Sequence, residues 1–250
     1  MDYSSNNLTI CCYWYDRPMT AVDYLEWIEG FLKTLRTSDQ IFSMLYVVGR
    51  AGNNNIFIDP DGSNIKDATL SNISRDLAYI NTDSNNKSLE LTSNCVLGFS
   101  NSFVTTLDNK VPGCLVEIRI GKFAKNSVNT VILQISDTLG KEEFLKRLFA
   151  SLISYCQPVH ANCGRVAVDT LLAQPVGDIY VGWLTYLTGI AAVDLLPKDI
   201  DTSRFLDGVI IQTSDLPAFV DEEEKIEKML SVISALQPHG LLKNPRRRTS

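Results

Sequence analysis

The side chains best suited to acid–base chemistry are few in this sequence. It contains two histidines, His160 and His239, whereas hydrolytic triads and most proton shuttles depend on this residue. His239 lies between Pro238 and Gly240, where we expect exposure or an interaction with a helix dipole. The shortage of histidine favours a protein that is not an enzyme.

Three possible metal ligands lie close together in the sequence Cys156-x3-His160-x2-Cys163. A structural zinc site needs a fourth ligand and usually has cysteine pairs spaced two to four residues apart. No fourth ligand is evident nearby, so we expect a helix-to-strand corner and no metal. The sequence alone leaves open whether these three residues bind one.

Other short motifs lack essential members. Asp59-Pro60-Asp61-Gly62 does not supply the alternating ligands of an EF-hand loop, and Gly49-x2-Gly52 lacks the lysine of a phosphate-binding loop. The Gly-x-Ser-x-Gly elbow of esterases is also absent from the sequence. We therefore expect no catalytic residues and no cofactor.

Two polar features are typical of a partner-binding surface instead. Asn/Asp-rich loops suit adaptable polar contacts, and a run of acids steers a protein towards a basic partner. Solvated loops and acids that favour a helix start are the alternative reading. The candidate binding residues are Asn53, Asn54, Asp59, Asp61, Glu222, Glu223 and Glu224.

The elements that must position these residues follow from hydrophobic periodicity. Helical spacing predicts three main helices, at about 20–37, 141–156 and 221–236, and a short helix at about 73–80. The last of the three main helices is expected to bury five apolar residues: Ile226, Met229, Leu230, Ile233 and Leu236. Period-two and apolar runs predict strands at about 8–15, 42–48, 95–104, 115–120, 130–135, 164–172, 179–187 and 208–213. Strands in consecutive runs, without regular βαβ alternation, predict an α+β fold with a mostly antiparallel sheet packed with about three main helices. We expect a single domain over 1–242, followed by a basic, disordered tail at 243–250.

Composition and charge restrict the partners and the compartment. The 250 residues carry 23 Lys and Arg against 29 Asp and Glu, a formal charge of −6, which argues against direct binding of nucleic acid. Residues 1–7 lack a basic segment followed by an apolar one, and no charge-free apolar run reaches about 20 residues. The six cysteines do not form a disulfide framework for a chain this long. We expect a cytoplasmic protein that does not contact a membrane.

Several blocks of the sequence resemble the bacterial immunity protein fifty-two family. They occur in the same order over about residues 10–242. The blocks are Tyr13-Trp14-Tyr15-Asp16-Arg17, the apolar pattern from Ala21 to Leu35, Gly98-Phe99-Ser100-Asn101-Ser102-Phe103, Val131-Ile132-Leu133-Gln134, Val181-Gly182-Trp183-Leu184-Thr185-Tyr186-Leu187, and Ala235-Leu236 with Gly240-Leu241-Leu242. Residues 49–94 depart from the pattern.

The resemblance implies an immunity protein that binds and blocks a cognate antibacterial toxin, often one delivered by type VI secretion. It further implies a nuclease toxin of restriction-endonuclease fold, whose active site the protein would occlude. The motif residues Tyr13, Trp14, Trp183 and Tyr186 lie on expected strands, and we expect them to form core. An adaptor or structural subunit of a secretion complex, and an enzyme of unrecognised type, are the alternatives. The toxin, the stoichiometry and the choice between occlusion and allosteric inhibition stay open.

Overall fold

The computed structural model has an α+β architecture with antiparallel strand pairing, which confirms the expected fold class. It describes residues 7–14, 17–49, 54–77, 98–108, 110–122, 128–172, 179–189 and 192–243. The chain divides into two compact units: unit 1 comprises Met1 and Trp14–Leu133, and unit 2 comprises Asp2–Tyr13 and Gln134–Ser250. The expectation of a single domain stays a prediction. None of the helices in the described ranges is both long and apolar enough to cross a membrane.

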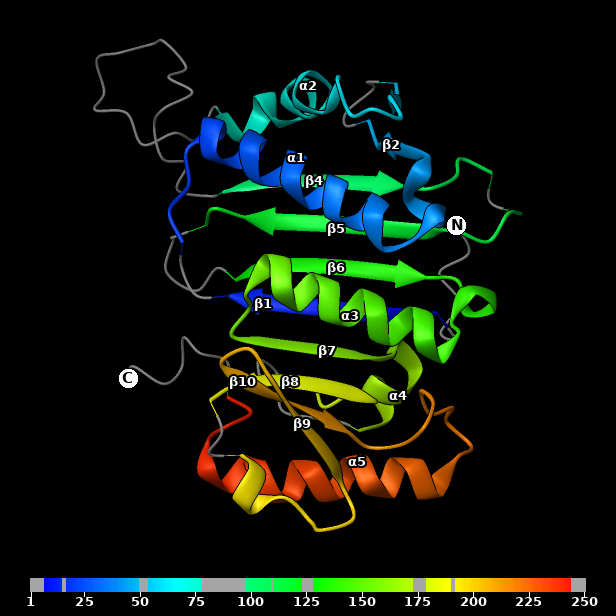
Figure 1. Ribbon diagram of the computed structural model, residues 1–250, viewed down its shortest axis with the longest axis vertical. Coiled ribbons are helices and arrows are strands. Elements are labelled where there is room, and N and C mark those ends of the chain that lie inside the picture. Colours follow the sequence, from blue (N-terminus) through cyan, green and yellow to red (C-terminus); the bar gives the residue numbers. More distant parts are fainter. Residues whose placement is uncertain are drawn as a thin grey trace. The chain divides into compact units, whose positions relative to one another are not determined.

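Unit 1 is a sheet with helices on one face (Figure 1). Its hydrogen-bonded strand order is β3-β2-β4-β5-β6. The helices α1 and α2 pack against each other, and α2 also packs on β4. The bounds are α1 Ala21–Ser38, η1 Gln40–Ser43, β2 Leu45–Val47, β3 Ile56–Ile58, α2 Ile65–Leu77, β4 Phe99–Val104, β5 Cys114–Ile120 and β6 Asn129–Ile135.

The helix α1 begins and packs as its sequence predicts. Thr20 and Asp23 form a reciprocal capping box, in which the Thr20 hydroxyl accepts from the Asp23 N–H at 3.1 Å. The Tyr24 ring stacks on Phe99 of β4 with centroids 5.0 Å apart. The expected apolar stripe is confirmed, since its members are all buried: Ala21, Tyr24, Leu25, Ile28, Phe31, Leu32 and Leu35.

Unit 2 contains a sheet with the strand order β1-β7-β8-β10-β9. Its short 3-10 helices are η2 Asp137–Leu139, η3 Val193–Leu195 and η4 Gln237–His239. The remaining bounds are β1 Leu8–Trp14, α3 Glu142–Cys156, β7 His160–Arg165, α4 Val166–Leu171, β8 Leu184–Thr188, β9 Asp201–Phe205, β10 Gly208–Gln212 and α5 Glu223–Leu236.

Helices cover both faces of the strands of unit 2. The thiols of Cys12 on β1 and Cys156 on α3 are in contact, so α3 lies on the Cys12 face. The opposite face carries Val209 and Leu187, which share one buried apolar cluster with residues of α4 and α5. In the sheet register Leu187 is also the partner of His160. His160 therefore lies on the face that α4 and α5 cover.

Some expected elements differ from the structure. The predicted strand 164–172 is wrong: β7 ends at Arg165, and the chain turns directly into α4. Val168 and Leu172, which were expected in a strand, are four positions apart and both face the core, as residues on one side of a helix do.

Two expectations about helices also differ from the structure. Four helices of the described chain have seven or more residues, because α2 is longer and begins earlier than the short helix expected at 73–80. The expectation that Leu230 is buried in α5 is also wrong, since that side chain is exposed.

Candidate interaction surface

The candidate residues of unit 1 contribute mainly to a turn. Asn53 lies outside the described residues, and Asn54 is exposed. The N–H of Ser63 donates to Asp61 Oδ1 at 3.0 Å, and the Ser63 hydroxyl donates to Asp59 Oδ2 at 3.3 Å. The hydrogen bond from the Ser63 N–H is the largest cause that lowers the pKa of Asp61. Both carboxylates therefore stabilise the turn that leads into α2, although Asp61 is exposed.

A basic side chain holds the same turn against α1. Arg36 Nη1 donates to the carbonyl oxygens of Asp59 at 2.7 Å and Pro60 at 3.0 Å, while Nη2 donates to that of Ile58 at 3.0 Å. These contacts use backbone oxygens, so they position the loop without neutralising its carboxylates by direct pairing. The local structure accounts for Asp59 and Asp61 without a partner.

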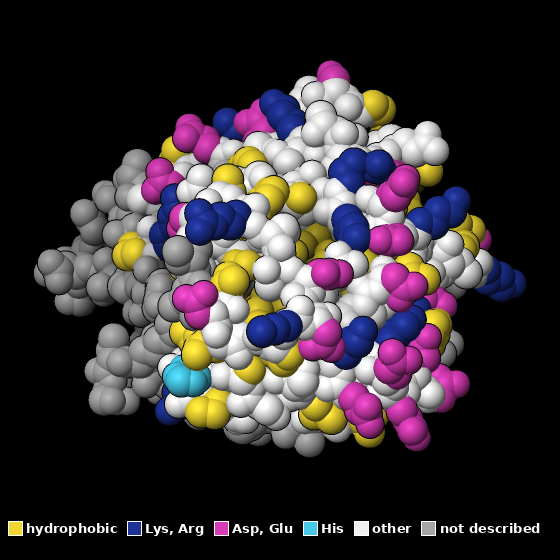
Figure 2. Space-filling view, turned by 60° about the horizontal axis from the view of Figure 1, so that its bottom comes forward, with side chains coloured by type: hydrophobic (Ala, Val, Ile, Leu, Met, Phe, Trp, Pro, Cys, Tyr) yellow, Lys and Arg dark blue, Asp and Glu magenta, His cyan; other side chains and the backbone are white. Residues whose placement is uncertain are grey.

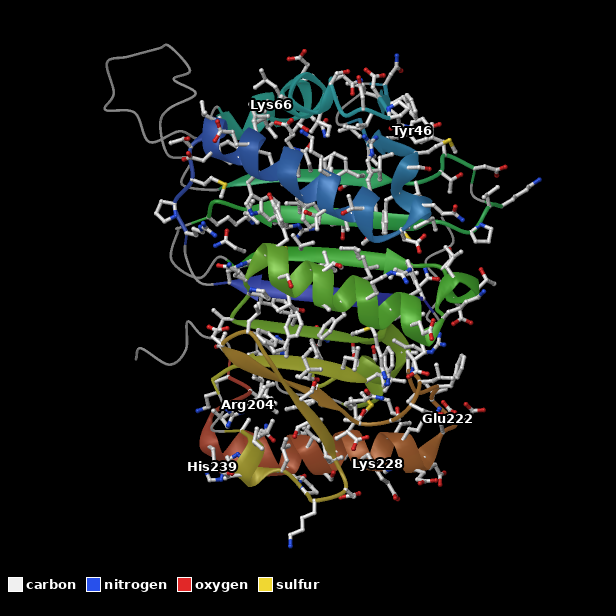
Figure 3. The ribbon with its side chains drawn as sticks, viewed as in Figure 1. Tyr46, Lys66, Arg204, Glu222, Lys228 and His239 are labelled. Carbon is white, nitrogen blue, oxygen red and sulfur yellow. The ribbon has the colours of Figure 1, made fainter. Side chains whose placement is uncertain are left out.

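The candidate residues of unit 2 lie where α5 begins (Figure 3). Glu222 Oε2 accepts from the N–H of Phe219 at 2.7 Å, and Glu222 Oε1 pairs with Lys225 Nζ at 2.8 Å. These partners lower the pKa of Glu222, with the Lys225 contact the larger cause. Glu223 and Glu224 are exposed in the first turn of the helix. Glu222 thus has a local role, and the other two acids face solvent.

More acids surround this helix start. Residues 215–225 contain five acids and one base, Lys225, which also lies 3.7 Å from an oxygen of Asp215. Figure 2 shows acidic side chains gathered towards the lower right of the view, the side on which α5 begins in Figure 1. The structure places the unit 1 and unit 2 candidates in different units, so we treat the acids around the start of α5 as a surface of their own.

Exposed apolar side chains lie next to these acids, and the sequence analysis missed them. Leu216, Phe219 and Val220 precede α5 and are exposed by 40%, 39% and 52%. Their run Leu216-Pro217-Ala218-Phe219-Val220 was visible in the sequence, but an apolar run ordinarily signals burial. Within this run, Pro217 and Ala218 are buried, whereas the three larger side chains are exposed.

The possible metal ligands do not converge. His160 and Cys163 are three positions apart on β7, so their side chains point to opposite faces of the sheet. Cys156 lies on α3 against Cys12. In the parts of the chain that the structure describes, no group of three or more His, Cys, Asp or Glu residues is arranged to hold a metal.

His160 is buried rather than poised for proton transfer. Its ring stacks on Tyr13 with centroids 5.5 Å apart, and the side chain is fully buried. Burial lowers the pKa of His160 to about 3, although a contact with the backbone of Tyr180 opposes the shift. A histidine that is neutral throughout the physiological range, and closed to solvent, suits packing better than general acid–base chemistry.

A small pocket lies in unit 1. Its volume of about 10 Å³ holds roughly one water molecule. The lining is mainly apolar and comprises Trp14, Arg17, Met19, Trp27, Ile120, Gly121 and Asn129. A ligand pocket for a small molecule is ordinarily about 300–1,000 Å³, so this one is too small for such a ligand.

The family-like motif residues are part of the core, as expected. Trp14, Trp183 and Tyr186 are buried, and Tyr13 is half-buried. The Trp183 indole donates to the carbonyl of Ser214 at 2.7 Å, which attaches the 214–220 segment to the sheet. Trp183 therefore helps to position the surface, and none of these motif residues forms it.

Comparisons with known proteins concern the fold. No protein-family model and no curated protein sequence matches the chain. The solved structure of the Pseudomonas aeruginosa T6SS protein PA0821 is similar, with a TM-score of 0.57 and 14% sequence identity, and the match covers 95% of this chain and 73% of that chain. At this identity the likeness shows a similar fold, and the resemblance to immunity protein fifty-two stays a prediction.

Proposed function

We propose that this chain is an immunity protein of a type VI secretion system, which binds and neutralises a cognate antibacterial toxin in the cytoplasm. The observation that carries the proposal is the exposed acidic surface at the start of α5, formed around Glu223 and Glu224. The similar fold of a T6SS protein and the sequence resemblance to immunity protein fifty-two support it.

The charge of this surface favours a basic partner. The formal charge of −6 and the five acids of residues 215–225 would accelerate encounter with a positively charged protein, because complementary fields raise association rates. A nuclease has a basic substrate-binding face, since it must contact phosphates. The proposed partner is therefore a nuclease toxin of restriction-endonuclease fold, and the acids would occupy its DNA-binding face and occlude the active site.

Binding and inhibition can be tested with purified proteins. The probe is the C-terminal toxic domain encoded by the neighbouring gene, with plasmid DNA as its substrate. We expect this protein to form a stable complex with the domain and to stop DNA cleavage at equimolar amounts. Uninhibited cleavage would contradict the proposal, and stable binding to secretion-machinery components without protection would favour the adaptor alternative.

Charge reversal tests the acidic surface itself. Glu223→Lys with Glu224→Lys should slow association about 10-fold at low ionic strength, with a smaller difference at high salt. The control is Glu142→Lys with Glu143→Lys, which replaces two acids in the first turn of α3 with a similar loss at the helix dipole and also breaks the Glu142–Lys146 ion pair at 2.7 Å. Equal association rates for both pairs would show that the acids of α5 do not guide the toxin.

A further inference from the structure

We propose that the acids at the start of α5 are the rim of an interface whose apolar centre is Phe219, and that its occupant is a protein with an apolar recess ringed by Lys and Arg. This inference rests on the proposed function and identifies the part of unit 2 that performs it. The apolar centre comprises Val166, Leu216, Phe219 and Val220, and we call it the anchor surface. Each of these side chains is at least 39% exposed.

The segment that carries the anchor surface is held in one conformation. The Ser214 carbonyl accepts from Trp183 Nε1 at 2.7 Å and from Gln212 Nε2 at 2.6 Å. The Ser214 hydroxyl donates to the Leu216 carbonyl at 2.7 Å, and the Leu216 N–H donates to Asp215 Oδ1 at 3.0 Å. A segment fixed by so many contacts has little freedom left to lose on binding, which is the advantage of preorganisation.

Phe219 is fixed from below by a buried cation. The Cζ atom of Arg165 lies 3.7 Å from the centroid of the Phe219 ring, within the range of a cation–π interaction. Arg165 is almost fully buried, and its Nη1 pairs with Asp137 Oδ1 at 2.6 Å. Val166 follows Arg165 directly and begins α4, so the same contact brings α4 beside Phe219. In Figure 1 α4 and the segment leading into α5 lie at the same end of unit 2.

The composition of this surface matches that of a protein interface. Interfaces have an apolar centre enriched in aromatic residues and a polar rim, and a buried aromatic side chain near the centre often carries much of the binding energy. Here the rim is acidic: Asp215, Asp221, Glu223 and Glu224. Basic groups on the partner would be attracted to such a rim, and an apolar recess would cover Phe219 without leaving a polar group unsatisfied.

The two parts of the surface should control different rates. Rim charges act at long range and set the association rate, whereas a desolvated anchor sets the dissociation rate. Phe219→Ala should therefore raise the dissociation rate from the toxic domain about 30-fold and leave the association rate within about twofold. Val220→Ser should raise the dissociation rate several-fold, and it serves as the second variant if Phe219→Ala alters folding.

Binding kinetics of the full chain with the purified toxic domain test this inference, with circular dichroism of each variant as the folding check. Leu230→Ala is the matched control, since Leu230 is a similarly exposed apolar residue on α5, 42% accessible; its dissociation rate should equal that of the wild type. If the wild type binds and both anchor variants dissociate at the wild-type rate, the anchor surface is wrong and the proposed function survives. If the wild type does not bind, the proposed function fails and this inference is overturned with it.

Discussion

Replacing Asp169 with asparagine should remove a large pH dependence from the stability of unit 2. Asp169 lies on α4, and within the described residues its buried Oδ1 has no hydrogen-bond partner. The backbone of Gly164 packs against it: a Cβ added there would lie 3.5 Å from Oδ1. Burial raises the pKa of Asp169 from 3.8 to about 7, because the apolar surroundings disfavour the charged carboxylate.

The size of the effect follows from this shift. A difference of about three pKa units between the folded and unfolded states corresponds to about 4 kcal/mol. Because the folded-state pKa is the higher one, the contribution is complete below about pH 4 and is lost as the pH rises towards 7. Asparagine has no proton to lose at this pH. Asp169→Asn should therefore gain stability relative to the wild type as the pH rises, by about 3 kcal/mol between pH 5 and pH 8.

His160 acts in the opposite direction but cancels in this comparison. Burial lowers the pKa of His160 to about 3, so the unfolded chain takes up a proton near its ordinary pKa of 6.5 and the folded chain does not. Stability from His160 is therefore lost as the pH falls below about 6.5. Since the wild type and the Asp169 variant both contain His160, the difference between them reports on Asp169 alone.

Urea denaturation at about pH 5, 6, 7 and 8 gives the measurement. The control is Asp199→Asn, an exposed aspartate of the same unit, which should follow the wild-type curve. A stability difference between Asp169→Asn and the wild type that does not change with pH would refute the reasoning, because it would mean that Asp169 titrates alike in the folded and unfolded chains.

Three further substitutions should alter stability in stated directions. Leu206→Gly should raise the melting temperature by about 2–4 °C, because Leu206 has a φ of +50° in the β9–β10 turn and is 61% exposed; an unchanged or lower value would contradict this strain. Asn101→Ala should lower the free energy of unfolding, measured by chemical denaturation, by about 1–3 kcal/mol, because buried Asn101 accepts from Asn72 and donates to the Tyr24 hydroxyl, both at 2.9 Å. An unchanged free energy of unfolding would show that these hydrogen bonds do not stabilise the fold. Thr20→Ala should cost about 1 kcal/mol through loss of the capping box, with Thr20→Ser close to the wild type; equal losses for the two variants would contradict a capping role.

Helices with one strong apolar stripe were predictable from the sequence. The stripe of α1 and the first-turn acid Asp23 determine where that helix begins and which face is buried. The error at Leu230 has a geometric cause: one residue beyond Met229 turns the side chain by about 100° around α5, away from the buried stripe. Periodicity identifies the helix more securely than the edges of its buried face.

Polar edge strands could not be predicted. The strand β9 has the sequence Asp201-Thr202-Ser203-Arg204-Phe205, and most of its side chains are exposed. With neither face buried, the strand has no alternation of polar and apolar residues to reveal it. It forms because β10 provides a paired neighbour in the register Ser203 to Ile210, which is a tertiary interaction.

The acids of the candidate surface were predictable, whereas its apolar centre was not. Glu223 and Glu224 follow from a charge run at a helix start. Exposure of Phe219 depends on Arg165, which is distant in the sequence, and on the Trp183 contact with Ser214. No local pattern contains these two contacts, so an apolar run that normally predicts burial instead becomes a surface.

The central claim, neutralisation of a toxin, is tested most directly by survival of bacteria that express the toxic domain of the neighbouring gene with and without this protein. We expect full rescue by the wild type and by the Glu142/Glu143 control pair, and weaker rescue by the Glu223/Glu224 pair and by Phe219→Ala. Killing that the wild-type protein does not relieve, although both proteins accumulate, would contradict the claim.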